Sequence, residues 1–298
     1  MTDFYVLFGD YLKNQKSSSE NTCESYLRDV AVYLNFLKTQ NHSPTDADEA
    51  TVNRFITFLK GINRTVATIS RNLASIRCFY KFLVFQGFME INPAKSIKIE
   101  KATKKLPHVL TSAEIENLLS CPDITEPKGC RDKAMLELLC STGIRVSELI
   151  NLNIKDINLR TGMLHCNGAK SVRSIPVYPA AIVAVSDYIY RMRGVITGPD
   201  SGSALFVNLN GGRLTRQGFW KIIKGYANEA GIMKEITPHV LRHSFAINNL
   251  ENGASVKDIQ TMMGHADISS TQVYLQLLNS DSKVSPVYSE TAQSVKLG

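Results

Sequence analysis

Apolar residues recur at helical spacing throughout the N-terminal third of the chain. The first set lies at i, i+3, i+4, i+7 and i+8, on one face of a helix: Phe4, Leu7, Phe8, Tyr11 and Leu12. The same spacing predicts three further helices before residue 94. Their boundary signals are, in order, the capping-box-like Asn21-x-x-Glu24, Thr45-x-x-Asp48 with Gly61, and Gly87. Four amphipathic helices with short connections predict a small bundle.

The pattern breaks over residues 95–106, a lysine-rich stretch between two prolines with little apolar periodicity. We expect a linker there, so that residues 1–94 and 107–298 form two domains. After the linker, helical patterns resume at a capping box from Thr111 to Glu114, at 131–141, 180–193 and 215–230, from Ser255 to Gly264, and in a helix that carries Tyr274.

Residues with a preference for strands gather between about residues 156 and 177. Turn signals at Thr161-Gly162 and at Asn167-Gly168-Ala169-Lys170 interrupt them, which predicts a small antiparallel sheet. The predicted fold class is therefore mainly α with a small antiparallel β-sheet, in two domains.

The chain has 298 residues, 44% of them hydrophobic, and can bury two ordinary cores. Its formal charge of +7 favours a polyanionic partner, and most of the excess precedes residue 107, where 15 Lys and Arg face 10 Asp and Glu. We find no signal-type start, no apolar stretch approaching about 18 residues, and no C-x-x-C pair among the six cysteines. These features predict a reduced, cytoplasmic protein without a membrane partner.

Three separated stretches carry two arginines, two histidines and one tyrosine within the second domain: Thr142 to Glu148, Thr237 to Ser244, and Gly264-His265 with Tyr274. Guanidinium groups are permanently charged and planar, and they bind phosphate oxygens in pairs. Arg145 and Arg242 are therefore candidates for binding a phosphodiester.

Tyr274 is the candidate nucleophile, and its proton must leave as it attacks because a free tyrosine has a pKa of about 10. His239 lies three residues before Arg242 on the same helix face, so it is a candidate base or oxyanion donor. Lys170, on the predicted hairpin, is a candidate general acid for the leaving alkoxide. These stretches contain no metal-ligand cluster.

Each feature alone has an ordinary structural explanation. An arginine paired with Glu148 is commonly structural, and a His-x-x-Arg pair occurs by chance in many helices. A tyrosine at an amphipathic helix position belongs to the core more often than to an active site. The ordered set in one basic chain favours the functional interpretation.

These motifs resemble those of the tyrosine recombinases of the phage-integrase family, with Xer-like length and layout. The resemblance rests on Thr142 to Leu149, Pro238 to Ala246 and Met263 to Tyr274, and it spans essentially the whole chain. It implies an N-terminal SAM-like core-binding bundle and an α+β catalytic domain. It assigns the active-site positions, with Glu148 as a supporting acid, to Arg145, Lys170, His239, Arg242, His265 and Tyr274.

Members of that family cut one strand of each DNA partner through a 3′-phosphotyrosine and exchange strands through a Holliday junction. The resemblance implies double-stranded DNA with an inverted-repeat core site as the partner, and no metal, nucleotide or other cofactor. It also implies a homotetramer, or a heterotetramer with a related recombinase, in which each protomer passes its C-terminal tail to a neighbour. An accessory DNA translocase or architectural protein is a further partner to consider.

The hairpin departs from the Xer-like pattern. Such enzymes usually carry a lysine just before the hairpin glycine, where this chain has Asn167. Lys170 is the only lysine in the predicted hairpin, so it is assigned the lysine position.

Basic side chains on polar helix faces are the expected DNA contacts. Such a face on the fourth predicted helix suits a phosphate backbone, although a solvated helix surface explains it equally well. Arg173 and His243 belong to the set but are interpreted first as supports for neighbouring side chains. The whole set is Arg64, Arg71, Arg77, Lys81, Lys101, Arg173, Arg213, Arg216, Lys221, Lys224 and His243.

Two other functions stay open at this point: a DNA-binding accessory factor that does not recombine, and a type IB topoisomerase-like nicking and closing enzyme. The biological setting is open too. Lack of an added arm-binding domain favours resolution of chromosome dimers, or of transposon or plasmid cointegrates, over integration of a mobile element.

Overall fold

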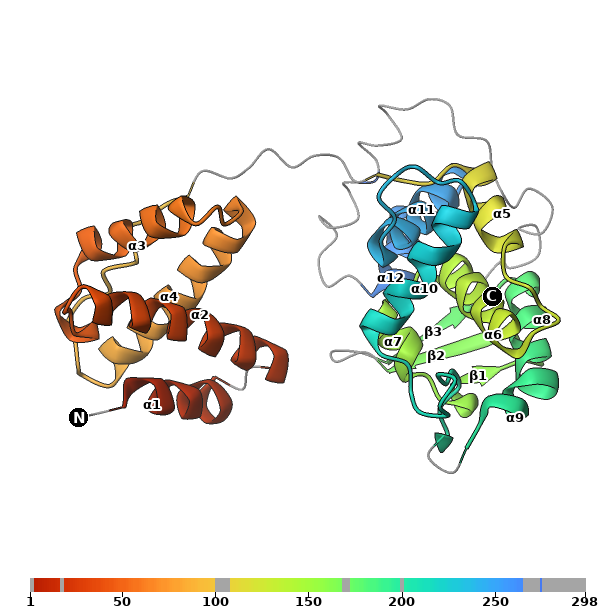
Figure 1. The fold of residues 1–298 in the computed structure, drawn as a ribbon, viewed down its shortest axis with the longest axis horizontal. Helices are drawn as coiled ribbons and strands as arrows, with labels where there is room; N and C mark the ends of the chain where they lie inside the picture. The colour runs from red at the N-terminus through yellow and green to blue at the C-terminus, as the bar shows by residue number, and fades with distance from the viewer. Residues whose placement is uncertain are drawn as a thin grey trace. The chain divides into compact units, whose positions relative to one another are not determined.

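The computed structural model describes residues 3–16, 19–99, 108–167, 172–198 and 201–264, together with Tyr274. The chain divides into two compact units, Met1–Lys105 and Leu106–Gly298 (Figure 1). Most of the expected linker, 95–106, lies outside the described residues, as does the expected helix start before Tyr274.

The described residues of the N-terminal unit form the predicted four helices: α1 (Phe4–Asp10), α2 (Glu20–Thr39), α3 (Glu49–Gly61) and α4 (Val66–Phe85). A π-helical turn, Tyr11–Gln15, continues α1. The apolar faces meet in a core rich in aromatic rings, where α4 contacts both α2 and α3. The buried hydroxyls of Tyr33 and Tyr80 hydrogen-bond to each other at 2.7 Å, so neither polar group is left without a partner.

Two of the predicted helices begin close to the expected signals, but their capping residues differ from the expected ones. α2 begins at Glu20, where the hydroxyl of Ser19 caps it, and α3 begins at Glu49, where the carboxylate of Asp48 caps it. The residues around Thr45 form a separate 3₁₀ turn instead. Ser19 and Asp48 both have an extended backbone, and their side chains accept hydrogen bonds from free N–H groups in the first turn. These capping residues, rather than Asn21 and Thr45, set the first residue of each helix.

The C-terminal unit is built around a helix buried on nearly every side, α6 (Pro127–Thr142), which contacts α5, α7, α8 and α11. Its apolar residues lie in the core that extends over the sheet. The other helices are α5 (Ser112–Ser120), α7 (Val146–Asn151), α8 (Pro179–Asp187), α9 (Arg193–Ile196), α10 (Arg216–Glu229), α11 (Pro238–Glu251) and α12 (Val256–Met263).

The predicted small antiparallel sheet is confirmed, with strand order β1-β2-β3. Its strands are β1 (Ile157–Asn158), β2 (Met163–Asn167) and β3 (Val172–Pro176). Leu164 of β2 pairs with Ile175 of β3, and both side chains are buried. Because side chains alternate along a strand, Arg173 faces the interior with Ile175. The predicted fold class, mainly α with a small antiparallel sheet, is confirmed. No helix within the described ranges has the length and apolar character needed to cross a membrane.

Gly143 ends α6 and brings the following turn close to α11. Its φ is 59°, in the left-handed region that glycine adopts without strain. A Cβ at this position would lie 2.2 Å from Cδ1 of Phe245, on α11. The turn that carries Ile144 and Arg145 therefore approaches α11 as closely as it does only because residue 143 has no side chain.

We predict that Gly143→Ala destabilises the C-terminal unit by about 1–3 kcal/mol, since it adds backbone strain and a clash with Phe245. Trp220, the single tryptophan of the chain, lies on α10 of this unit and reports its unfolding by fluorescence in urea. Gly225→Ala on the same helix is the matched control, because nothing lies within 4 Å of its added Cβ. Equal unfolding midpoints for the two variants would contradict the prediction.

Candidate active site

Arg145 stands at the start of α7, directly after the Gly143 turn. Its backbone N–H donates to Oε2 of Glu148 at 2.7 Å, which closes the first turn of α7. Its guanidinium donates through Nη2 to the carbonyl of Gly264 at 2.9 Å. The side chain is still 43% exposed, so the guanidinium is anchored and accessible to solvent at once.

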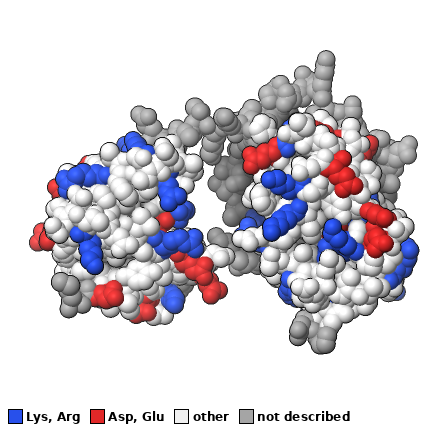
Figure 2. Space-filling view, viewed as in Figure 1, with Lys and Arg blue, Asp and Glu red and all other residues white. Residues whose placement is uncertain are grey.

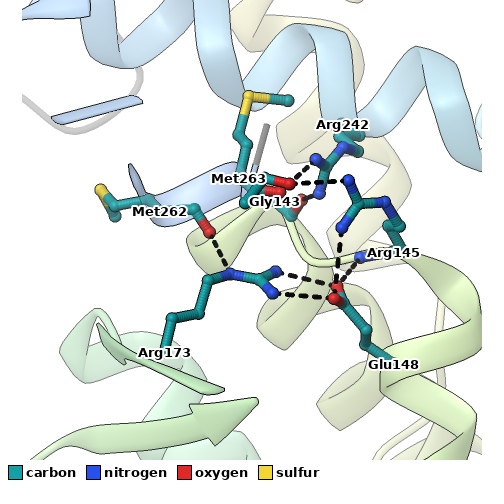
Figure 3. A network of polar contacts seen from close by, with 8 residues as sticks. Gly143, Arg145, Glu148, Arg173, Arg242, Met262 and Met263 are labelled. Atoms are coloured by element: carbon teal, nitrogen blue, oxygen red, sulfur yellow. Dashed lines mark hydrogen bonds and ion pairs between the residues drawn. The ribbon is translucent and has the colours of Figure 1, made fainter. Parts of the chain in front are cut away.

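Glu148 is the acceptor for two arginines (Figure 3). Arg173 binds it through both terminal nitrogens, at 2.8 and 2.9 Å, and Nη1 of Arg145 lies 3.3 Å from Oε1. Burial alone would raise the pKa of Glu148. The hydrogen bonds from Arg173 and from the Arg145 backbone, with the charges of both arginines, lower that pKa below its usual value. Glu148 is therefore a carboxylate at neutral pH.

Three guanidinium groups converge on the C-terminal end of α12. Arg173 donates to the carbonyl of Met262 at 2.8 Å, Arg242 donates to that of Met263, and Arg145 donates to that of Gly264 (Figure 3). The last carbonyls of a helix have no partner within it and carry partial negative charge. The three cations satisfy these carbonyls, which ties β3, α11 and the start of α7 to one helix end.

Arg242 is only 5% exposed and also donates to the carbonyl of Gly143. Burial, followed by the nearby charge of Arg145, lowers the pKa of Arg242 to about 10. The guanidinium is thus still protonated at neutral pH. A buried cation beside a second cation is costly, and an anion bound between Arg145 and Arg242 would relieve that cost.

A pocket of about 250 Å³ opens beside these arginines. Arg145 and Arg242 line it together with His239, which is exposed on the first turn of α11. Arg216 and Trp220 of α10 line its other side. Figure 2 shows Lys and Arg side chains over α10 on the face in view. Positive charge, planar donors and an open mouth suit a phosphate group.

Tyr274 packs against α11 and α12, among Phe245, Ile247 and Ile259, and is only 2% exposed. Its hydroxyl lies 2.8 Å from Nδ1 of His243, and the two rings are 5.5 Å apart. Burial raises the pKa of Tyr274, although the charge of Arg242 opposes that effect. Burial, then the neighbouring His239 and Arg242, lower the pKa of His243 to about 4, so its imidazole is neutral at pH 7.

The structure thus brings Arg145, Glu148, His239, Arg242 and Tyr274 together in one unit. Lys170 and His265 lie outside the described residues, and so does Lys101. Among the described residues, no cluster of three or more His, Cys, Asp or Glu side chains has the arrangement of a metal site.

The expected DNA contacts fall into two groups. Arg64, Lys81, Arg216, Lys221 and Lys224 are exposed. Several others already bind the protein, and their partners are as follows: Arg71 binds Asp29, Arg77 binds the carbonyls of Ala94 and Ile97, and Arg213 binds Asn153 and the carbonyls of Ile150 and Leu152.

The prediction that Arg173 contacts DNA is wrong, because its guanidinium is buried against Glu148 and Met262. Its interpretation as a support for a neighbour is the one that holds. His243 likewise serves a neighbour, namely Tyr274. Sequence reasoning missed that contact. The spacing of His243, four residues after His239 on the same helix face, was the available signal.

Two family models match the chain. The Phage integrase family matches residues 108–280, and the Phage integrase, N-terminal SAM-like domain, matches residues 6–87. Together they cover most of both units, in the order that the sequence predicts.

Full-length relatives agree with these models. Tyrosine recombinase XerD of Oceanobacillus iheyensis is 44% identical over 271 residues, covering 90% of this chain and 91% of the relative. Tyrosine recombinase XerC of Herpetosiphon aurantiacus is 38% identical over 272 residues, covering 90% of this chain and 89% of the relative.

Solved structures share the fold at lower identity. XerH site-specific recombinase bound to palindromic difH substrate has a TM-score of 0.75 at 20% identity, covering 93% of this chain and 83% of that one. The Tn1549 transposon integrase in complex with circular intermediate DNA has a TM-score of 0.74 at 20% identity, with coverages of 92% and 95%.

We predict that Glu148→Gln destabilises the C-terminal unit by about 3–5 kcal/mol, since it leaves the buried guanidinium of Arg173 without its counter-charge. Urea unfolding followed by Trp220 fluorescence measures the change. Asp187→Asn is the control, because it removes an exposed i,i+4 pair with Arg191 worth about 0.3–0.5 kcal/mol. If both variants lose only a few tenths of a kcal/mol, the buried Glu148–Arg173 pair does not stabilise the C-terminal unit as predicted.

The C-terminal unit should also lose stability as the pH falls from about 6.5 to about 4. In that window the unfolded chain binds a proton at His243 that the folded chain does not, so protonation favours the unfolded state. The folded state therefore has its full stability, as far as His243 is concerned, above pH 6.5 and loses it as the pH falls to about 4. His243→Asn should flatten the difference between urea midpoints at pH 7 and pH 5. His108→Asn, at an exposed position, is the control, and an unchanged pH dependence in His243→Asn would refute the assignment.

Proposed function

We propose a specific chemical step for this chain, which belongs to the phage integrase family: Tyr274 attacks a DNA phosphodiester held between Arg145 and Arg242. The observation that carries the proposal is the pocket beside these two arginines, together with the buried Tyr274, whose hydroxyl lies 2.8 Å from Nδ1 of His243 on α11. The chain is accordingly a site-specific recombinase of the tyrosine type.

Binding comes first. A phosphodiester repels nucleophiles, and its transition state gathers negative charge on the non-bridging oxygens. Arg145 offers an anchored but exposed guanidinium, and Arg242 offers a buried one whose orientation is fixed by two backbone carbonyls. Preorganised donors of this kind are worth a few kcal/mol each, because they need not reorganise during the reaction. His239, on the same side of the pocket, adds a third donor.

The reaction exchanges one phosphodiester for another. The hydroxyl oxygen of Tyr274 forms a bond to phosphorus as the bond to the 5′ oxygen breaks, which gives a 3′-phosphotyrosine and a free 5′-hydroxyl. Lys170 gives the leaving oxygen its proton, and His265 supports the phosphate. The reverse step, with the 5′-hydroxyl of a second DNA partner, joins the strands through a Holliday junction. The energy of the broken phosphodiester is kept in the phosphotyrosine, so rejoining needs no hydrolysis of a nucleotide.

The assembly follows from strand exchange between two DNA sites. Four protomers act together, as a homotetramer or with a related recombinase, on double-stranded DNA with an inverted-repeat core. Residues 1–94 and 107–298 close around that DNA, and the C-terminal tail passes to a neighbour. The exposed basic side chains Arg64, Lys81, Arg216, Lys221 and Lys224 contact its backbone. Lys101 on the linker does the same.

The relatives bear on the biological setting. They are named XerD and XerC, and a fold neighbour is a recombinase bound to a palindromic substrate. These names favour recombination over the accessory-factor and topoisomerase-like alternatives. We propose that the protein acts in the cytoplasm and resolves chromosome dimers or transposon or plasmid cointegrates, with a DNA translocase or architectural protein as its accessory factor, rather than integrating a mobile element.

Covalent trapping tests the proposal. The purified protein is incubated with fragmented DNA of the native host and denatured with detergent, and the attached DNA is recovered and sequenced. We expect fragments that share an inverted-repeat core, and none from Tyr274→Phe, since phenylalanine keeps the packing but has no nucleophile.

The other outcomes separate the alternatives. Recovery of fragments with no shared sequence would favour the topoisomerase-like enzyme. DNA binding without any trapped fragment would favour the accessory factor, and equal recovery from Tyr274→Phe would exclude Tyr274 as the nucleophile.

A further inference from the structure

The nucleophile and the proposed phosphate pocket are served by two different histidines. His239 is exposed on the first turn of α11 and lines the pocket with Arg145 and Arg242. His243 lies one turn further along the same face, half-buried, with its ring centroid 6.3 Å from that of His239. Only a small part of one helix therefore separates the phosphate side of the site from the tyrosine side.

His243 contacts the hydroxyl of the tyrosine. Nδ1 of His243 is 2.8 Å from the hydroxyl oxygen of Tyr274, which is the distance of an O–H···N hydrogen bond. A general base must lie within hydrogen-bond reach of the proton that it removes, and this is the first test of a candidate. His243 meets that test in the structure.

We propose that His243, rather than His239, accepts the proton of Tyr274 during strand cleavage, and that His239 binds the phosphate. This inference rests on the proposed function. The neutral imidazole carries its own proton on Nε2 and receives the phenolic proton on Nδ1 as the tyrosine oxygen bonds to phosphorus. The bond between phosphorus and the 5′ oxygen breaks, and that oxygen is protonated by the general acid. In rejoining, the imidazolium returns its proton to Tyr274.

The surroundings of His243 explain why its imidazole can accept a proton at neutral pH. Among the residues that the structure describes, its neighbours with charge or a titratable proton are His239 and Arg242 on its own helix and the hydroxyl of Tyr274. Burial and the charge of Arg242 keep the free imidazole neutral, so Nδ1 retains its lone pair. A phosphate bound at Arg242 offsets that positive charge and makes His243 more basic. The base thus becomes stronger when the substrate is in place.

The test uses a labelled duplex that carries the site recovered by covalent trapping, and it measures single-turnover cleavage. We expect His243→Ala to cleave about 100-fold or more slowly than the unmodified protein, and to be partly restored by added imidazole. Pyrrole, which has the same shape but no acceptor lone pair, should not restore it. His239→Ala is the matched control: it should lose affinity for the phosphate and gain nothing from imidazole.

A second substrate distinguishes loss of the general base from loss of the general acid. In a duplex with a 5′-bridging sulfur at the cleavage point, the leaving thiolate needs no proton. Loss of the general acid is then masked, whereas loss of the base is not. We expect His243→Ala to stay slow on this substrate and Lys170→Ala to recover. Cleavage of the sulfur substrate by His243→Ala at the rate of the unmodified protein would overturn the proposal.

Asparagine separates positioning from proton transfer. Its side-chain amide places a hydrogen-bonding atom near the position of Nδ1 but has no useful basicity. We expect His243→Asn to bind the duplex normally, to unfold in urea with a normal midpoint at pH 7, and to cleave as slowly as His243→Ala. Wild-type cleavage by His243→Asn would show that the residue only orients Tyr274.

The inference and the proposed function fail in different ways. If the unmodified protein forms no covalent complex, the proposed function fails and the inference with it. If it does form one and His243→Ala matches it, only the inference fails. A measurement without DNA adds to this: histidine ¹⁵N spectra at pH 7 should show an unprotonated Nδ1 at His243 whose signal moves in Tyr274→Phe, and a protonated Nδ1 would contradict the inference.

Discussion

The candidate site depends on the convergence of three arginines on the C-terminal end of α12. Arg173, Arg242 and Arg145 bind, in order, the carbonyls of Met262, Met263 and the C-cap residue Gly264, and Glu148 binds two of the three cations. Cations at a helix C-terminus are favourable, but three of them close together repel one another. The carboxylate of Glu148 offsets part of that repulsion, and a bound phosphate would offset more. The contacts that stabilise the fold thus also place the positive charges that can bind an anion.

The helical spacing of α11 gives its side chains two different roles in this site. On α11, residues three and four apart share a face, so Arg242 and His243 both lie beside His239. Arg242 contacts the carbonyl of Gly143, and His243 contacts Tyr274. Burial increases along that face, from the exposed His239 to the buried Arg242. Burial lowers the pKa of both Arg242 and His243, to about 10 and about 4. At neutral pH, Arg242 therefore stays charged while His243 is neutral. One short helix therefore supplies both a phosphate-binding cation and a neutral acceptor for a phenolic proton.

Local patterns predicted most of the fold, because apolar spacing and capping residues act over one or two turns. They failed where two capping residues compete, as at Ser19 and Asp48. They also failed for contacts between distant segments: nothing near Arg145 indicates that its guanidinium meets Gly264, 119 residues away. The burial of Arg173 could have been predicted from the sequence, because the alternation of side chains along β3 places it on the inward face with Ile175.

The most direct test of the account is to identify the amino acid that carries the DNA. The trapped complex would be digested with protease and nuclease, and the nucleotide-bearing peptide sequenced by mass spectrometry. The account predicts a single modified peptide, with a nucleotide joined through its 3′-phosphate to the oxygen of Tyr274. A nucleotide on any other side chain, or one joined through a 5′-phosphate, would contradict it.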